Sequence, residues 1–186
     1  MRIIGGTRRG LKLAEVGAGD TAAHLRPTSD RVREAIFNLL INAHGNPVTG
    51  ARVLDLFAGT GALGLEALSR GAAEATFVDD GQAALALLKA NIAKMRSEGQ
   101  TRILRQDATR MPPNAAAPYT LVFLDPPYGK GMGELALVAA QKGVWLAPGA
   151  VVVWEDAVAP ALPQGFAPLD QRRYGDTVVT LLTAPE

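Results

Sequence analysis

The sequence predicts an α/β fold with a doubly wound, mostly parallel sheet. Short apolar runs alternate with helical patterns from residue 52 onward, which is the order that parallel strands joined by crossover helices require. A glycine-rich turn joins the first of these runs to the helix that follows it. The chain has 186 residues, of which 48% are hydrophobic, so it is long enough for one compact domain with a full core.

The segment before this pattern is expected to form a small basic extension. Residues 2–13 mix apolar side chains with glycines, which favours a short hairpin or an irregular strand pair, and residues 17–26 are typical of a loop. The sequence therefore predicts two parts, a hairpin-like N-terminal extension over residues 1–27 and a larger domain over residues 28–186.

The larger part begins with a helix and continues with alternating strands and helices. Thr28 or Ser29 can cap the first helix, which is expected to run to about Ile41. Buried strands are expected at the short apolar runs, over residues 52–56, 75–78, 102–104, 121–124 and 151–154. Helices are expected between them, over residues 62–70, 82–95 and 133–142. Two last strands are expected around a Gly-Asp turn, which is a weak hairpin signal, over residues 171–174 and 177–182.

The composition excludes several kinds of site. There is no cysteine, which excludes disulfides and thiolate ligands, and His24 and His44 lack the spacing of metal ligands. We therefore expect no metal. No apolar run approaches the roughly 20 residues that span a bilayer, and no apolar leader follows Met1. A cytoplasmic protein with no membrane contact is expected.

The net charge of +1 hides an uneven distribution of charge. Residues 1–33 hold seven basic and three acidic residues, or +4, whereas the remainder holds 12 basic and 15 acidic residues, or −3. Basic charge gathered at one end is typical of an arm that contacts phosphates, although a solvated surface would show the same pattern. The candidate contacts to RNA are Arg8, Arg9, Arg26, Arg31 and Arg33. Arg31 and Arg33 point in different directions on a helix, and either could instead form a salt bridge with Asp30 or Glu34.

The turn after the first strand has the pattern D-x-F-x-G-x-G, formed by Asp55, Phe57, Gly59 and Gly61. Glycines permit a tight turn and a close approach of the backbone to a ligand, but dehydrogenases share such turns. The carboxylate of Asp55 distinguishes this turn from the turn of a dehydrogenase, because it would repel a pyrophosphate and attract the ammonium of a methionyl group. This position therefore argues against a nicotinamide coenzyme.

Two further acids follow the next strands. Asp79 ends the second strand, where a carboxylate can accept hydrogen bonds from both hydroxyls of a ribose, and Asp80 is the competing choice. Asp107 follows the third strand and could accept a hydrogen bond from an adenine amino group. Each acid alone could be a helix cap or a surface charge. Together with the glycine turn, they predict a bound adenosine derivative.

The fourth strand leads into Asp125, Pro126, Pro127 and Tyr128. The two prolines lack N–H groups and have fixed φ angles, so the carbonyls around them are held rigidly. If Asp125 and a proline carbonyl accept the N–H groups of an exocyclic amine, its lone pair can be aimed at an electrophilic methyl group. Tyr128 offers a ring on which a base can stack. The alternative is a rigid surface turn with an incidental tyrosine.

These residues together resemble those of class I (Rossmann-like) methyltransferases of the RsmD type, which make N2-methylguanine in bacterial 16S ribosomal RNA. The resemblance covers nearly the whole chain. Its most specific part is the R-P-T-S-D-R-V-R-E-A-I-F-N block at residues 26–38, since many amino-methyltransferases share the glycine turn and D-P-P-Y. The other matching blocks are R-I-I-G-G at 2–6, D-L-F-A-G-T-G at 55–61, E-A-L-S-R-G-A at 66–72 and Y-G-D-T at 174–177.

The resemblance implies a seven-stranded sheet with an antiparallel last strand, S-adenosylmethionine as cofactor, and 16S rRNA in partly assembled 30S subunits as partner. It places Asp55, Gly59 and Gly61 around the methionyl group, Asp79 at the ribose, Asp107 at the adenine, and residues 125–128 at the target base. Relatives often carry Glu where this chain has Asp79, and the shorter acid should still reach a ribose.

Three alternatives stay open. A DNA adenine-N6 methyltransferase shares D-P-P-Y but usually carries a sizeable target-recognition domain, for which no segment of this chain is left. A protein-glutamine methyltransferase typically has Asn in place of Asp125. A non-enzymatic RNA-binding assembly factor could keep a vestigial pocket, but the intact motif at residues 125–128 argues against it.

Overall fold

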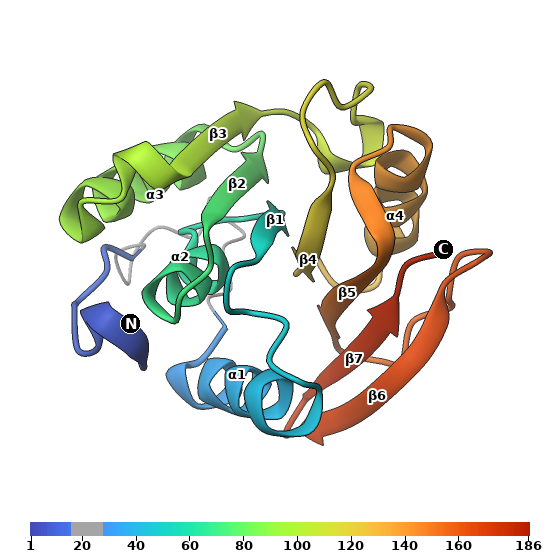
Figure 1. Ribbon diagram of the computed structural model, residues 1–186, viewed down its shortest axis with the longest axis horizontal. Helices are drawn as coiled ribbons and strands as arrows, with labels where there is room; N and C mark the ends of the chain where they lie inside the picture. The colour runs from blue at the N-terminus through green and yellow to red at the C-terminus, as the bar shows by residue number, and fades with distance from the viewer. Residues whose placement is uncertain (16–27) are drawn as a thin grey trace.

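A seven-stranded sheet runs through the computed structural model, which describes residues 1–15 and 28–186 (Figure 1). The strands are β1 (Arg52–Leu56), β2 (Glu74–Asp79), β3 (Thr101–Arg105), β4 (Tyr119–Leu124), β5 (Leu146–Asp156), β6 (Ala167–Tyr174) and β7 (Thr177–Thr183). Their order is β3-β2-β1-β4-β5-β7-β6, with β1 to β5 parallel to one another and β7 antiparallel to β5 and β6. The expected doubly wound sheet with an antiparallel last strand is confirmed.

The helices lie close to their predicted positions. They are α1 (Asp30–Ala43), α2 (Ala62–Ser69), α3 (Gln82–Met95) and α4 (Met132–Lys142), with short 3-10 turns η1 (Gly6–Arg8), η2 (Glu98–Gln100) and η3 (Ala108–Arg110). Of the two possible caps for α1, Ser29 is the one that accepts a hydrogen bond from the backbone N–H of Val32, at 3.2 Å.

Strand β5 is the element that differs most from the prediction. It begins at Leu146 rather than near Val151, and it passes through Pro148 and Gly149. Its pairing with β4 begins at Tyr119 and Leu146, and a register shift then separates Tyr119 from Leu121. Proline and glycine normally indicate a turn, but an irregularity in the ladder accommodates them here.

Side chains of the central strands alternate between the two faces of the sheet. One face, which includes Val53 and Phe77, packs with α1, α2 and α3. The other face, which includes Leu54 and Trp154, packs with α4. Two helical layers therefore enclose the sheet, and its strand ends are left at the rim.

The N-terminal residues fold back on themselves, with an isolated antiparallel bridge between Arg2 and Lys12. Its Ile3 and Leu13 are buried in the same core as α2, so the extension packs directly against the larger part of the chain. In Figure 1 it lies beside α2, across the molecule from β6 and β7. The loop expected over residues 17–26 lies outside the described residues.

Within the described ranges, no helix combines the length and the hydropathy needed to cross a membrane. The same ranges contain no group of three or more His, Cys, Asp or Glu side chains placed to hold a metal ion.

Candidate active site

The predicted site residues gather at the edge of the sheet where the parallel strands end. The strand order reverses direction between β1 and β4, and ligands of doubly wound folds bind at such a switch point. Five neighbouring strands each carry an acid at or just after this end, namely Asp107, Asp79, Asp55, Asp125 and Glu155. The first four were predicted from the sequence, and Glu155 was not.

The turn after β1 has a strained backbone. Phe57, Gly59 and Gly61 all have positive φ, at 58°, 56° and 79°, which is unusual for the non-glycine Phe57. The positive φ of Gly61 favours glycine there, and a Cβ would also lie 2.4 Å from a methyl carbon of Leu88 on α3, which would have to shift. The turn therefore joins the end of β1 directly to the start of α2.

Asp79 holds this turn in place from the end of β2. Its two carboxylate oxygens accept hydrogen bonds from the backbone N–H groups of Gly59 and Gly81, each at 2.8 Å. Each oxygen keeps lone-pair capacity for a ligand hydroxyl. Asp80 is exposed and lies beyond the strand, so the geometry favours Asp79 as the acid of this site.

Asp55 lies beneath the turn, with 2% of its surface exposed. Its Oδ2 accepts a hydrogen bond from the backbone N–H of Gly64, at 2.9 Å. Burial raises the pKa of Asp55 to about 8, against the opposing effect of the Gly64 hydrogen bond and with a smaller contribution from the charge of Asp79. In the described part of the chain, no Lys or Arg forms an ion pair with it. A cationic ligand would offset the free-energy cost of burying the charged form of this carboxyl.

Replacing Asp55 with asparagine should stabilise the free protein more at pH 8 than at pH 5. Asparagine keeps an acceptor for Gly64 but carries no charge. The stability that protonated Asp55 contributes is full only below about pH 4 and is lost progressively as the pH rises from there to its raised pKa of about 8. We expect Tm to rise by about 3 °C at pH 8, which corresponds to roughly 1 kcal/mol for a domain of this size. Thermal unfolding at both pH values measures it, and an equal shift at both would contradict the explanation.

Asp107 lies at the start of η3, after β3. Its Oδ1 accepts hydrogen bonds from the hydroxyl of Thr109, at 2.7 Å, and from the backbone N–H of Thr109, at 2.8 Å. The hydroxyl hydrogen bond makes the largest contribution to lowering the pKa of this carboxyl. Asp107 therefore caps η3. Its contact with an adenine stays a prediction, in which Oδ2 would be the accepting oxygen.

The D-P-P-Y motif begins directly after β4. The backbone N–H of Asp125 lies 3.5 Å from the carbonyl oxygen of Leu56, so the motif starts beside the glycine turn. Pro126 is buried, whereas Pro127 and Tyr128 are half-buried. The start of the D-P-P-Y motif thus lies beside the end of β1, where the glycine turn begins.

Residues that the sequence analysis missed complete the surroundings of this motif. The hydroxyl of Thr28 lies 3.3 Å from Oδ2 of Asp125 and 2.9 Å from Oε2 of Glu155. The hydroxyl of Tyr128 lies 3.3 Å from Oε1 of Glu155 and 3.5 Å from the hydroxyl of Thr177. Glu155 could have been found by the same criterion as the other acids, because it follows the apolar run of β5. Thr28 was considered only as a helix cap.

The structure places Arg8 and Arg9 away from the motif. Both are exposed, and the backbone N–H of Arg8 donates to the hydroxyl of Ser69, at 2.9 Å. Ser69 is the last of the eight residues of α2, and α2 leads away from the glycine turn. Eight helical residues span about 12 Å, so these two arginines lie about one helix length from the glycine turn.

The prediction that Arg33 contacts RNA is wrong. Its side chain is fully buried, and one terminal nitrogen lies 2.9 Å from Oδ1 of Asp30 while Nε lies 3.6 Å from Oε2 of Glu66. Arg33 therefore forms a structural salt bridge, which was the alternative to a contact with RNA. Arg31 is exposed in the first turn of α1, and Arg26 lies outside the described residues.

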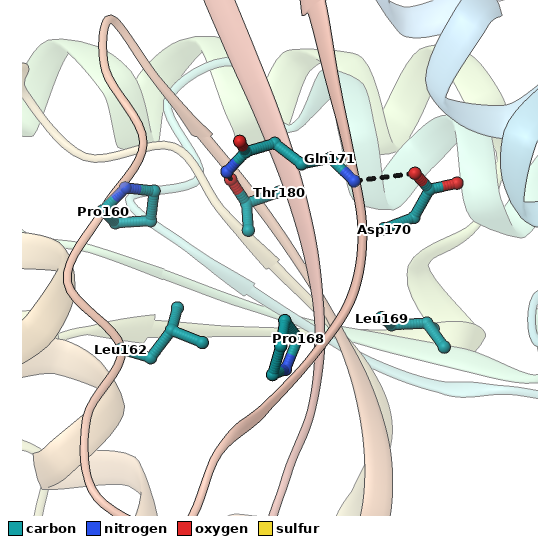
Figure 2. A pocket seen from close by; sticks show the side chains of 7 residues that line it. All are labelled: Pro160, Leu162, Pro168, Leu169, Asp170, Gln171 and Thr180. Atoms are coloured by element: carbon teal, nitrogen blue, oxygen red, sulfur yellow. Dashed lines mark hydrogen bonds between the residues drawn. The ribbon is translucent and has the colours of Figure 1, made fainter.

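A separate hollow of about 400 Å³ lies against β6 and the loop before it (Figure 2). Its lining is Pro160, Leu162, Pro168, Leu169, Asp170, Gln171 and Thr180. Its polar side chains are occupied locally, since Asp170 accepts from the backbone N–H of Gln171 and the Gln171 amide donates to Thr180. None of the predicted site residues lines it.

A doubly wound sheet with this strand order, a glycine turn after β1 and Asp-Pro-Pro-Tyr after β4 defines a class I methyltransferase. The family model described as "Conserved hypothetical protein 95" matches residues 1–183. The chain belongs to this family, the RsmD family of methyltransferases.

Individual relatives agree with this assignment. Ribosomal RNA small subunit methyltransferase D of Escherichia coli is 39% identical over 163 residues, which cover 88% of this chain and 78% of the relative. The enzyme of the same name from Haemophilus influenzae is 36% identical over 181 residues, which cover 94% and 89%. The solved structure of yhhF from Escherichia coli is 35% identical, with a TM-score of 0.81 over 100% of this chain and 98% of that one.

Proposed function

We propose that this protein transfers a methyl group from S-adenosylmethionine to the exocyclic N2 of a guanine in 16S rRNA. The observation that carries the proposal is that the D-P-P-Y motif, which supplies Asp125 and Tyr128, begins beside the end of β1, where the glycine turn held by Asp79 starts. The names of the relatives from E. coli and H. influenzae support ribosomal RNA of the small subunit as substrate. We further propose that the reaction takes place in the cytoplasm, on partly assembled 30S subunits.

The described residues fit S-adenosylmethionine. Asp79 can accept the ribose hydroxyls, because its oxygens use only part of their capacity on Gly59 and Gly81. Burial raises the pKa of the Asp55 carboxyl, no Lys or Arg of the described residues forms an ion pair with it, and the methionyl ammonium would supply a cation. When bound, the cofactor supplies an electrophilic methyl group on a sulfonium.

The residues after β4 fit an exocyclic amine. Such an amine is a weak nucleophile, because its lone pair is delocalised into the ring. Asp125 and a carbonyl of Pro126 or Pro127 can accept its two N–H groups, which turns the lone pair toward the methyl group and stabilises the developing positive charge. The methylated nitrogen then loses a proton. Stacking of the base on Tyr128 contributes roughly 1–3 kcal/mol.

Labelled methyl transfer tests this proposal against its rivals. The purified protein is incubated with S-adenosylmethionine labelled in its methyl group and with 16S rRNA or 30S particles from cells that lack the enzyme. We expect label in the RNA and none in duplex DNA or in protein. Label in DNA would favour the adenine-N6 alternative, and cofactor binding without transfer to any of these would favour an assembly factor.

We also propose that Arg8, Arg9 and Arg31 contact RNA phosphates. For Arg8 and Arg9, this requires the RNA to extend along α2 for about 12 Å from the glycine turn. Replacing Arg8 and Arg9 together with alanine should weaken RNA binding and reduce its salt slope by roughly one per lost phosphate contact. Lys89 and Lys94, which are exposed on α3, provide a control that removes the same charge. If both double variants change the slope equally, the arm makes no specific contact.

A further inference from the structure

A buried cluster of hydrogen bonds joins the two ends of the D-P-P-Y motif through side chains outside it. Thr28, Glu155 and Thr177 have exposed fractions of 8%, 5% and 6%. One oxygen of Glu155 faces the hydroxyl of Thr28, and the other faces the hydroxyl of Tyr128. Thr28 in turn faces Asp125. Glu155 is therefore linked to both functional side chains of the motif.

The hydroxyl of Thr28 has a single proton and lies between two carboxylates. Its oxygen is 2.9 Å from Glu155 and 3.3 Å from Asp125, so the shorter hydrogen bond goes to Glu155. Thr28 therefore bridges the two carboxylates, and its position between them restrains the Asp125 side chain relative to Glu155.

The same carboxylate restrains the aromatic ring. The hydroxyl of Tyr128 lies 3.3 Å from Oε1 of Glu155 and also faces Thr177 on β7. A ring held at its hydroxyl end presents its face in one orientation before a base arrives. Stacking then costs less side-chain entropy, which is the advantage of a preorganised site.

We propose that Glu155 and Thr28 are positioning residues that orient Asp125 and Tyr128 for an incoming exocyclic amine. This inference rests on the proposed function, since it assigns the amine to Asp125 and the base to Tyr128. It extends the site from the four residues of the motif to β5 and to the residue two before α1. Neither residue is expected to touch the cofactor.

The test compares Thr28→Val with Thr28→Ser. Valine keeps the branched shape and removes the hydroxyl, whereas serine keeps the hydroxyl. We expect Thr28→Val to lower kcat by about 10-fold or more, because small errors in positioning are costly, while KM for RNA changes less. Thr28→Ser should recover most of the lost rate. Affinity for S-adenosylhomocysteine and Tm are measured on each variant, and both should stay close to those of the original protein.

Glu155→Leu and Glu155→Gln repeat the comparison from the other side of the hydrogen bond. Leucine removes both acceptors, whereas glutamine can still pair with Thr28 and Tyr128, so leucine should cost more rate. The Thr28→Val/Glu155→Leu double variant should lose less than the product of the two single losses, because the residues act together.

Three outcomes would overturn the inference. These are unchanged kcat in Thr28→Val, equal losses in Thr28→Val and Thr28→Ser, or losses matched by equal losses of cofactor affinity in every variant. If the original protein binds cofactor but methylates no RNA, the proposed function itself fails and the inference fails with it. Activity in the original protein with an unaffected Thr28→Val variant overturns this inference alone.

Discussion

Replacing Asp125 with alanine should lower kcat for RNA methylation by roughly 10²–10³-fold, the loss typical of removing one preorganised group that stabilises transition-state charge. The amine then has no carboxylate to accept its N–H group and to balance the positive charge that forms on nitrogen. Asp125 follows β4, whereas Asp55 and Asp79 belong to β1 and β2, so we expect cofactor affinity to change only a few-fold. Single-turnover methyl transfer and calorimetry with S-adenosylhomocysteine measure the two effects separately.

Asp125→Asn is the matched control for this prediction. Asparagine preserves the shape of the side chain and one acceptor oxygen, so it should be impaired less than alanine. A loss of cofactor affinity as large as the loss of kcat would mean that Asp125 supports the cofactor site. Full activity in Asp125→Ala would remove it from the chemistry altogether.

Replacing Asp79 with alanine should weaken cofactor binding by about 10–100-fold, since unsatisfied polar groups cost roughly 1–3 kcal/mol. Two effects combine in this variant. The ribose hydroxyls lose their acceptor, and the N–H groups of Gly59 and Gly81 lose the carboxylate that holds the turn. Calorimetry with S-adenosylhomocysteine measures the loss directly.

Asp80→Ala is the control for Asp79, because it removes an equal charge from the adjacent, exposed position. We expect its cofactor affinity to be nearly unchanged. If the two variants were equally impaired, the effect would come from the charge of this edge and not from the hydrogen bonds of Asp79.

Much of the fold could be predicted because local patterns determine it. Strand β1 and helix α3 have the predicted bounds, since an apolar run bounded by glycines and a long periodic segment leave little choice. Strand β5 was predicted too short, because Pro148 and Gly149 normally break a strand. Only its pairing with β4, which is a long-range interaction, shows that the strand continues through them.

The acids of the site were partly predictable for a similar reason. The carboxyl ends of parallel strands meet at one edge, so Asp55, Asp79 and Asp125 could be grouped from the order of elements alone. The partners of Thr28 could not, because its contact with Glu155 joins residues 127 positions apart. The buried Arg33 pairs with Glu66 in α2, and the sequence of α1 alone does not reveal this partner. The sequence likewise did not reveal that Arg8 lies at the far end of α2.

The identity of the methylated nucleoside tests the central claim most directly. RNA from the transfer reaction is digested to nucleosides, and the methylated product is identified by mass spectrometry against standards. With 16S rRNA of partly assembled 30S particles as substrate, we predict N2-methylguanosine as the product, and its loss in Asp125→Ala. Methyl groups found instead on adenine N6, on a ring nitrogen or on a ribose hydroxyl would contradict the account.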